Sequence, residues 1–188
     1  MAKLIVLASG NGSNFQAIAE YFTLHGIHEV SALITDQLSA YAIERAKHLA
    51  ISYYVVPCFK KDRTMAEKIM ESIITLYQAD LIALAGYMRI LSPYFVAKFR
   101  GRIINIHPSL LPHYPGSNSI ERAFQAGEQM LGITIHYVDE GVDTGTVIVQ
   151  KAIVRAQTLE LMTEAIHQLE HETYPQILHK LLDSLAAK

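Results

Sequence analysis

The sequence of 188 residues predicts an α/β fold: an open, mostly parallel twisted sheet with helices on both faces and an antiparallel strand near the C-terminal part. Short apolar runs alternate with segments of helical periodicity, as in successive strand–helix–strand units. The run 81–85 is nearly all apolar, which is typical of a strand covered on both faces. Because no linker or internal repeat interrupts the pattern, a single domain over residues 1–188 is expected.

The first half of the chain predicts successive strand–helix pairs. The apolar run 3–8 leads into a glycine-containing loop, and a helix is expected to begin near Ser13. Later apolar runs bounded by polar residues predict strands, and longer stretches with apolar residues three and four apart predict helices. The further strands are expected at 30–35, 52–56 and 81–85, and the further helices at 40–50 and 63–77.

The second half predicts a different kind of pairing. A strand at 102–106 precedes two more strands, 133–138 and 147–154, which are separated by the polar loop 139–146. This arrangement is typical of a hairpin-like antiparallel pair.

A C-terminal helix is predicted by the spacing of its apolar residues. Leu159, Met162, Ile166 and Leu169 recur at helical intervals. Pro175 then either kinks this helix or starts a second one.

Composition and charge exclude several classes of protein. The net charge is −2 and no basic stripe is present, so a nucleic-acid partner is not expected. Cys58 is the only cysteine, which excludes an intrachain disulfide and a multi-cysteine metal site and predicts a buried structural thiol. No apolar run reaches the roughly 18 residues of a membrane span, and the N-terminal run is interpreted as a strand rather than a signal peptide. A cytoplasmic protein without a membrane partner is expected.

A glycine-containing loop, Gly10-Asn11-Gly12-Ser13-Asn14, follows the first predicted strand and opens the first helix. Two glycines allow the backbone to approach a ligand closely, and the N–H groups of a helix N-terminus favour a phosphate. A tight turn with a Ser or Asn cap is the structural alternative. Phe15 stands where a dinucleotide-binding fingerprint needs a third small residue, which argues against a nicotinamide dehydrogenase although Asp36 ends the second strand.

The most informative stretch is Asn105-Ile106-His107-Pro108, taken together with Asp143. Residues two apart on a strand project to the same face, so Asn105 and His107 can both donate hydrogen bonds to one developing oxyanion. Asp143 can pair with His107 and handle protons. The structural alternatives are a core histidine and a solvated acidic turn. The pattern predicts an acyl-type transfer through a tetrahedral intermediate, with no covalent nucleophile.

The loop 108–116 holds three prolines and is expected to be stiff beside this polar pair. Either Leu111-Pro112 or Tyr114-Pro115 can be cis, and the sequence does not distinguish them. Rigid backbone next to polar groups is what preorganised oxyanion binding requires.

A competing motif lies in the predicted C-terminal helix. His167, Glu170 and His171 form the H-x-x-E-H pattern of inverted zinc peptidases. Zinc needs a third protein ligand, and after Glu172, which directly follows His171, Asp183 is the only carboxylate side chain downstream. Most of this segment is therefore interpreted as helix surface.

These motifs together resemble the phosphoribosylglycinamide formyltransferase family, over residues 3 to about 182. The anchors are Ser9-Gly10-Asn11-Gly12-Ser13-Asn14, Ala85-Gly86-Tyr87-Met88-Arg89-Ile90-Leu91, Asn105-Ile106-His107-Pro108-Ser109-Leu110-Leu111-Pro112 and Asp143-Thr144-Gly145. The resemblance implies a Rossmann-like formyltransferase fold. It also implies transfer of a formyl group from 10-formyltetrahydrofolate, as co-substrate, to the amine of glycinamide ribonucleotide in de novo purine biosynthesis. No metal is implied.

The resemblance also implies roles for individual residues. The catalytic trio is matched by Asn105, His107 and Asp143. The ribonucleotide-binding positions are matched by Gly12, Ser13, Asn14 and Glu170, the first three at the phosphate. The folate-binding positions are matched by Arg63, Met88, Arg89, Ile90, Leu91, Asn105, Asp139, Glu140, Gly141, Val142 and Asp143.

The chain departs from the family pattern at two places. His167 stands where some relatives carry Gln, and Asn118-Ser119-Ile120 replaces a His-containing segment.

Two alternatives to the transferase stay open: a formyl-folate hydrolase with water as acceptor, and a non-catalytic module that binds a phosphate ligand. Small-molecule substrates are the expected partners, and the chain is expected to be a monomer or a homodimer.

Overall fold

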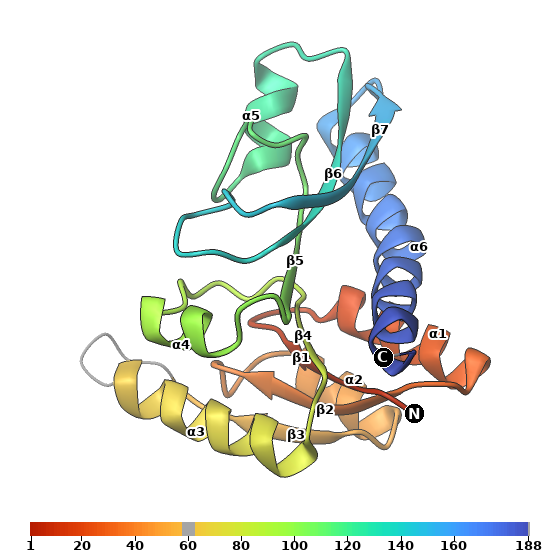
Figure 1. Cartoon of the computed structure of the whole chain (residues 1–188). Helices are drawn as coiled ribbons and strands as arrows, with labels where there is room; N and C mark the ends of the chain where they lie inside the picture. Colours follow the sequence, from red (N-terminus) through yellow and green to blue (C-terminus); the bar gives the residue numbers. More distant parts are fainter. Residues whose placement is uncertain (58–62, 188) are drawn as a thin grey trace. The chain divides into compact units, whose positions relative to one another are not determined.

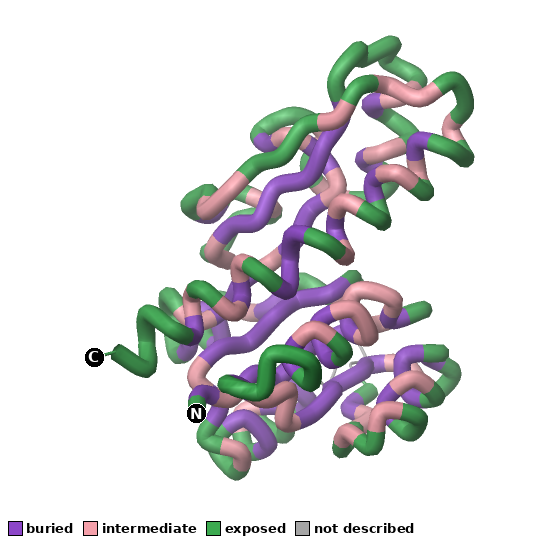
Figure 2. Tube along the Cα trace, turned by 90° about the vertical axis from the view of Figure 1, so that its right-hand side faces the viewer, coloured by how far each residue is buried: buried purple, intermediate pink, exposed green. Residues whose placement is uncertain are grey.

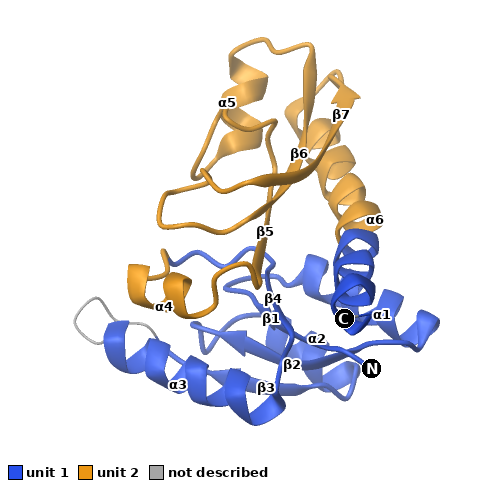
Figure 3. Ribbon diagram, viewed as in Figure 1, with its two compact units in different colours: residues 1–89, 175–188 blue, residues 90–174 orange. Residues whose placement is uncertain are grey.

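The computed structural model describes residues 1–57 and 63–187, so the prediction for Cys58 lies outside the described residues. Two compact units make up the chain. Unit 1 comprises residues 1–89 and 175–188, and unit 2 comprises residues 90–174 (Figure 3).

Unit 1 is built on four parallel strands in the order β3-β2-β1-β4. The chain order reverses after β3, so right-handed crossovers place α1 and α2 on one face and α3 on the other (Figure 1). The elements are β1 Lys3–Leu7, α1 Ser13–His25, β2 Glu29–Thr35, α2 Ala42–His48, β3 Ser52–Val55, α3 Arg63–Tyr77 and β4 Leu81–Leu84.

The two central strands of unit 1 form its core. All four residues of β4 are buried, and so are the last four of β1, as expected for strands covered on both faces. Figure 2 shows these strands as buried stretches of the chain. The predicted boundaries of this half are confirmed to within a few residues, and α3 matches its prediction at both ends.

Unit 2 contains an antiparallel arrangement. β5 pairs antiparallel with β6, and β6 pairs antiparallel with β7. The predicted hairpin is therefore confirmed, and the order β3-β2-β1-β4-β5-β6-β7 confirms the mostly parallel fold class. The elements are α4 Pro93–Lys98, β5 Ile103–His107, α5 Ser119–Gln125, β6 Met130–Tyr137 and β7 Val147–Val154.

The last helix, α6 Leu159–Ala186, belongs to unit 2 up to Tyr174 and to unit 1 from Pro175 onward. It is one helix with Pro175 inside it, so the alternative of a second helix is wrong. Among the described residues, no helix combines the length and apolar composition that crossing a membrane requires.

Candidate active site

Strand β5 carries Asn105 and His107 on one face, and its register with β6 gives each of them a cross-strand partner. Asn105 lies opposite His136, and His107 lies opposite Thr134. Directly opposed residues of an antiparallel pair come into side-chain contact. Accordingly, Nδ2 of Asn105 lies 3.2 Å from Nε2 of His136. The pairing therefore brings a second histidine into the predicted site.

Asp143 reaches the same place from the loop between β6 and β7. Its Oδ2 accepts a hydrogen bond from the backbone N–H of Gly116 at 2.8 Å and lies 3.3 Å from Nδ1 of His107. Its Oδ1 lies 3.4 Å from Nδ2 of Asn105. The three side chains that the sequence predicted to act together are thus neighbours within unit 2.

The loop that carries Asp143 depends on special backbone geometry. Asp143 itself has φ +55°, a left-handed conformation that Asp tolerates better than most residues. At Gly145, an added Cβ would lie 1.7 Å from the carbonyl oxygen of Tyr137. Only glycine allows this close approach, so Gly145 determines where the loop turns and hence where the carboxylate points.

Both ring nitrogens of His107 face acceptors. Nε2 lies 2.9 Å from the carbonyl oxygen of Tyr114, which can only accept, so Nε2 carries a proton. Nδ1 faces the carboxylate of Asp143. An imidazolium, with both nitrogens protonated, satisfies the two contacts at once. His107 is also buried, with 6% of its surface exposed.

His136 is held in a different state. Its Nδ1 lies 2.9 Å from the carbonyl oxygen of Tyr137, so Nδ1 carries the proton. Nε2 then accepts from the amide of Asn105 and lies 3.7 Å from Oδ1 of Asp143. The hydrogen bond at Nδ1 fixes the tautomer, and the contact at Nε2 fixes the orientation of the Asn105 amide.

The pKa of Asp143 lies below its ordinary value of 3.8. Burial raises this pKa, but the hydrogen bond from the backbone N–H of Gly116 and the positive charge of His107 lower it. The carboxylate is consequently ionised at neutral pH and can balance a positive charge on His107.

Buried polar contacts support the loop that holds His107. The hydroxyl of Thr134, which is fully buried, donates to the carbonyl oxygen of Ser109 at 2.7 Å and accepts from the N–H of Leu111 at 3.0 Å. Nε2 of Gln150 donates to the same hydroxyl at 2.9 Å. Of the two candidate bonds, Leu111–Pro112 is the one that is cis.

Sequence reasoning missed His136 and Thr134. Both lie in the strand predicted at 133–138, with side chains two apart and therefore on one face. Their involvement depends on the register of β6 against β5, and a single strand sequence does not encode that register. A polar pair inside an otherwise apolar strand was the available signal.

The glycine loop of unit 1 packs closely against the start of α2, and at Gly12 only glycine fits. Gly12 has φ +76°, and an added Cβ would lie 2.6 Å from Cβ of Ala42. α1 begins at Ser13, and no side chain caps it at Gly12. The Ser or Asn cap offered as the structural alternative is therefore not the arrangement in the described residues.

The predicted folate segment begins in unit 1, beside the glycine loop. The N–H of Met88 donates to Oγ of Ser9 at 2.9 Å, and Nε of Arg89 donates to Asp36 at 2.6 Å. In unit 2, Leu91 is buried. Met88 and Ile90, however, expose 75% and 65% of their surface, and such large apolar side chains on a loop are suited to a ligand contact.

The other predicted folate positions are divided between the units. In unit 1, Arg63 forms an ion pair with Glu67, with Nε 3.3 Å from Oε1. In unit 2, Asp139 accepts hydrogen bonds from its own loop, from the N–H of Gly141 at 3.1 Å and the hydroxyl of Thr144 at 2.7 Å. Asp139 therefore shapes the loop. The remaining loop residues, Glu140, Gly141 and Val142, are exposed.

Glu170, predicted at the ribonucleotide, lies in the unit 2 part of α6. It is 5% exposed, so this position is not the helix surface that the peptidase comparison suggested for most of the segment. A buried carboxylate on a helix is stable only when it is paired or hydrogen-bonded.

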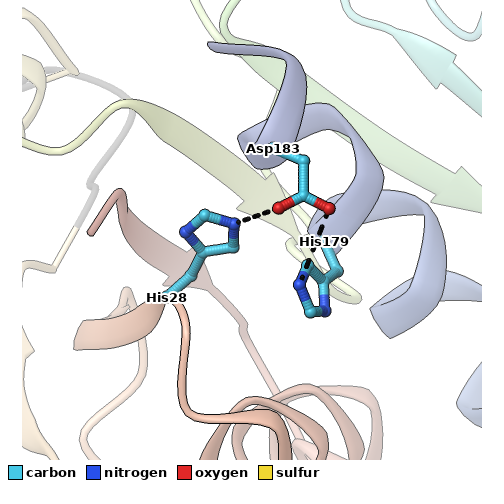
Figure 4. A group of neighbouring side chains, drawn as sticks. All are labelled: His28, His179 and Asp183. Atoms are coloured by element: carbon cyan, nitrogen blue, oxygen red, sulfur yellow. Dashed lines mark hydrogen bonds and ion pairs between the residues drawn. The ribbon is translucent and has the colours of Figure 1, made fainter. Parts of the chain in front are cut away.

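One group of side chains in residues 1–57 and 63–187 is close enough to share a cation: His28, His179 and Asp183, with ligand atoms within 4.8 Å of one another (Figure 4). Asp183 lies 3.0 Å from Nε2 of His28 and 3.7 Å from Nε2 of His179. The N–H of Ala2 donates to Nδ1 of His28 at 3.2 Å.

That last contact decides how the group behaves. Because Nδ1 of His28 accepts a hydrogen bond, its single proton is on Nε2 and points at Asp183. A metal-bound histidine has the reverse arrangement, with its second nitrogen donating. The group is therefore a hydrogen-bonded cluster that anchors the last turns of α6 within unit 1.

An Asn–His pair on a strand, completed by a loop carboxylate in an α/β sheet, defines an enzyme that acts on a carbonyl group through an oxyanion. A family model described as formyl transferase matches residues 2–178. The chain belongs to this family, among its phosphoribosylglycinamide formyltransferases.

Named relatives are similar along nearly the whole chain. The phosphoribosylglycinamide formyltransferase of Bacillus subtilis is 44% identical over 97% of this chain and 95% of its own length. The crystal structure of the Bacillus halodurans enzyme has a TM-score of 0.89 and 40% identity, covering 96% of this chain and 95% of that one. The Coxiella burnetii enzyme, solved in complex with CHES, has a TM-score of 0.92 and 38% identity, covering 97% and 88%.

Proposed function

We propose that Asn105, His107 and Asp143 transfer the formyl group of 10-formyltetrahydrofolate to the amine of glycinamide ribonucleotide. Formylation of this ribonucleotide is the activity of the chain's family, and it is a step of purine biosynthesis. The proposal adds three points: 10-formyltetrahydrofolate is the donor, the ribonucleotide amine attacks the formyl carbon directly, and the three residues have the roles given below. The observation that carries them is the contact of one carboxylate, Asp143, with both Asn105 and His107.

The reaction begins when the amine attacks the formyl carbon. The C–N bond forms, and the carbonyl oxygen becomes an oxyanion. Nδ1–H of His107 and Nδ2–H of Asn105 are the donors for this oxygen. Both of these atoms face Asp143 at distances of 3.3 and 3.4 Å, which are long enough that a better acceptor can replace the carboxylate.

Collapse of the tetrahedral intermediate breaks the bond to the folate nitrogen. The attacking amine must lose a proton, and the leaving nitrogen must gain one. Asp143, ionised and partly exposed, accepts the proton from the amine and returns it to the folate nitrogen, directly or through water. No redox partner enters, and no metal ion is required for the step.

His136 and Tyr114 keep the donors aligned. The carbonyl of Tyr114 holds Nε2 of His107, so Nδ1 remains the nitrogen available to substrate. Nε2 of His136 holds the amide of Asn105. Donors fixed in advance need no reorganisation during the reaction, and removing one such donor typically costs about 10²–10³ in rate.

Substrate binding follows the family pattern. Gly12, Ser13 and Asn14 hold the phosphate through backbone N–H groups at the start of α1, and Glu170 holds the ribose. Folate is bound by Arg63, by the segment 88–91 and by the loop 139–143. The chain works as one formyltransferase domain over residues 1–188, in the cytoplasm, as a monomer or homodimer, with small molecules as its only substrates.

Acceptor dependence tests this proposal. Release of tetrahydrofolate from 10-formyltetrahydrofolate is measured with glycinamide ribonucleotide and with water alone. Release that requires the ribonucleotide supports the transferase. Equal release without it would assign the chain to formyl-folate hydrolysis. Folded protein that binds phosphate ligands without turnover would assign it to a binding module, and circular dichroism of the same sample controls for folding.

A further inference from the structure

Three strand ends meet at one edge of unit 1. β1 lies between β2 and β4, all three are parallel, and Leu7 is level with Ile34 on one side and Leu84 on the other. The residues that follow these ends are Ser9, Asp36 and Gly86. In an open α/β sheet, ligands bind outside the carboxyl ends of the strands.

Ser9 links two of these ends directly. Its N–H donates to the carbonyl oxygen of Gly86 at 3.1 Å, and its Oγ accepts from the N–H of Met88 at 2.9 Å. Two hydrogen bonds therefore join the segment after β4 to Ser9, the residue before Gly10. The two segments that the proposed function assigns to different substrates share these hydrogen bonds.

Asp36 links the third end. Its side chain is completely buried, and Oδ2 accepts from Nε of Arg89 at 2.6 Å and from Nε2 of Gln37 at 2.8 Å. The side chain of Arg89 is 41% exposed. One end of the guanidinium is therefore held by a buried charge, while the group as a whole remains accessible from solvent.

The ion pair between Asp36 and Arg89 fixes the orientation of the arginine side chain. A buried carboxylate is stable only when it is paired and hydrogen-bonded, so it holds its arginine in one geometry. Burial raises the pKa of Asp36, but Ser9, Arg89 and Gln37 lower it by more, so the carboxylate is ionised at neutral pH. In a dinucleotide site, the acid at this position binds a ribose hydroxyl and must be accessible to the ligand. The carboxylate of Asp36 is instead buried and paired with Arg89.

We propose that Asp36 is a positioning residue for the folate co-substrate: it fixes Arg89, and with it Met88, against the segment that holds the ribonucleotide phosphate. This inference rests on the proposed function, because it takes Met88 and Arg89 as folate-binding residues. Asp36 acts through Arg89 and touches neither substrate. The folate-binding segment of unit 1 is thereby ordered before the folate binds.

The test is steady-state kinetics of Asp36→Asn, which keeps the side-chain volume and removes the charge. The KM for 10-formyltetrahydrofolate is expected to rise about 10- to 100-fold, the range for losing a hydrogen bond between charged groups. The kcat and the KM for the ribonucleotide are expected to stay within about twofold, because the catalytic trio is untouched.

Two further variants separate positioning from general destabilisation. Gln37→Leu removes the other donor to the same oxygen and leaves Arg89 in place, so the folate KM is expected to be unchanged. In an Arg89→Lys background, Asp36→Asn is expected to raise the folate KM far less than it does alone, because its effect passes through the arginine. Additive losses in that background would overturn the proposal.

Ser9→Ala provides a second test: it keeps the Asp36 carboxylate and its contact with Arg89, although it removes the hydrogen bond of Ser9 to that carboxylate. It removes the acceptor for the N–H of Met88, and a rise in the folate KM is expected. If the wild-type enzyme shows ribonucleotide-dependent turnover while Asp36→Asn and Ser9→Ala both keep the wild-type folate KM, the inference is wrong and the proposed function stands. If the wild-type enzyme does not turn over 10-formyltetrahydrofolate at all, the proposed function itself fails.

Discussion

His107 and Asp143 face each other in unit 2 with Nδ1 3.3 Å from Oδ2, although they come from the end of β5 and from the β6–β7 loop. Each is fixed by a second contact to the same surface loop. His107 donates to the carbonyl of Tyr114, and Asp143 accepts from the N–H of Gly116. The loop 108–116 therefore aligns both members of the pair.

Removing the charge of Asp143 is expected to slow the chemical step. Asp143→Asn keeps the shape, and Asn tolerates the left-handed backbone at this position. The kcat is expected to fall about 10²–10⁴-fold, the usual contribution of a proton-transfer group, with the ribonucleotide KM nearly unchanged. Glu172→Gln, on the exposed face of α6, is the control for loss of one negative charge. A wild-type kcat in Asp143→Asn would remove this residue from the mechanism.

Asp143→Asn is also expected to change how the free energy of unfolding depends on pH. The folded-state pKa of Asp143 lies below its ordinary value of 3.8. The ionised carboxylate therefore stabilises the folded state above the unfolded-state pKa, and this contribution is lost as pH falls through the folded pKa. In urea unfolding, the stability difference between wild type and Asp143→Asn is expected to shrink from about pH 5 downward. A difference that stays constant down to acid pH would contradict the assignment.

The buried hydroxyl of Thr134 is expected to support both stability and rate. Thr134→Val leaves the N–H of Leu111 without its acceptor and removes one of the two acceptors of the Gln150 amide, which keeps the carbonyl oxygen of Leu111. The free energy of unfolding is expected to fall by about 1–3 kcal/mol, the cost of a buried unsatisfied polar group. A lower kcat is expected as well, since the loop that aligns His107 loosens. Thr134→Ser keeps the hydroxyl and is the matched control; equal effects of the two variants would show that the methyl group matters instead.

Two glycines of the same loop, Gly10 and Gly12, are expected to differ in how much substitution by alanine weakens ribonucleotide binding. An alanine at Gly12 is strained by φ +76° and meets Ala42 at 2.6 Å, whereas an alanine at Gly10 meets nothing within 4 Å. Gly12→Ala is therefore expected to raise the ribonucleotide KM much more than Gly10→Ala, with the folate KM little changed in both. Kinetics with each substrate varied in turn checks this. A larger effect at Gly10 would mean that backbone geometry at Gly12 does not set the phosphate site.

Much of the fold follows from local patterns. The apolar run 81–85 and the helix at 63–77 were predicted nearly to the residue, because burial on both faces and a long amphipathic period leave clear signals. The short helices α4 and α5 were not predicted. Their lengths of 6 and 7 residues give too few turns for periodicity. In addition, Asn118, the N-cap of α5, has a left-handed conformation and forms no side-chain cap.

The site was predicted as a set of residue types and not as a geometry. Asn105 and His107 share a strand face by simple alternation, so their proximity was predictable. The contact of Asn105 with His136 depends on strand register. The hydrogen bond from His107 to the carbonyl of Tyr114 depends on the left-handed backbone of Tyr114. These are long-range or conformational features that no local pattern carries.

A double-mutant cycle tests the central claim that His107 and Asp143 act as one unit. The kcat is measured for His107→Gln, for Asp143→Asn and for the double variant under saturating substrates. Each single variant is expected to lose about 10²–10⁴ in rate, and the double variant is expected to be no slower than the slower single one, because each partner works through the other. Losses that multiply in the double variant would show that the two residues act independently and would contradict the account.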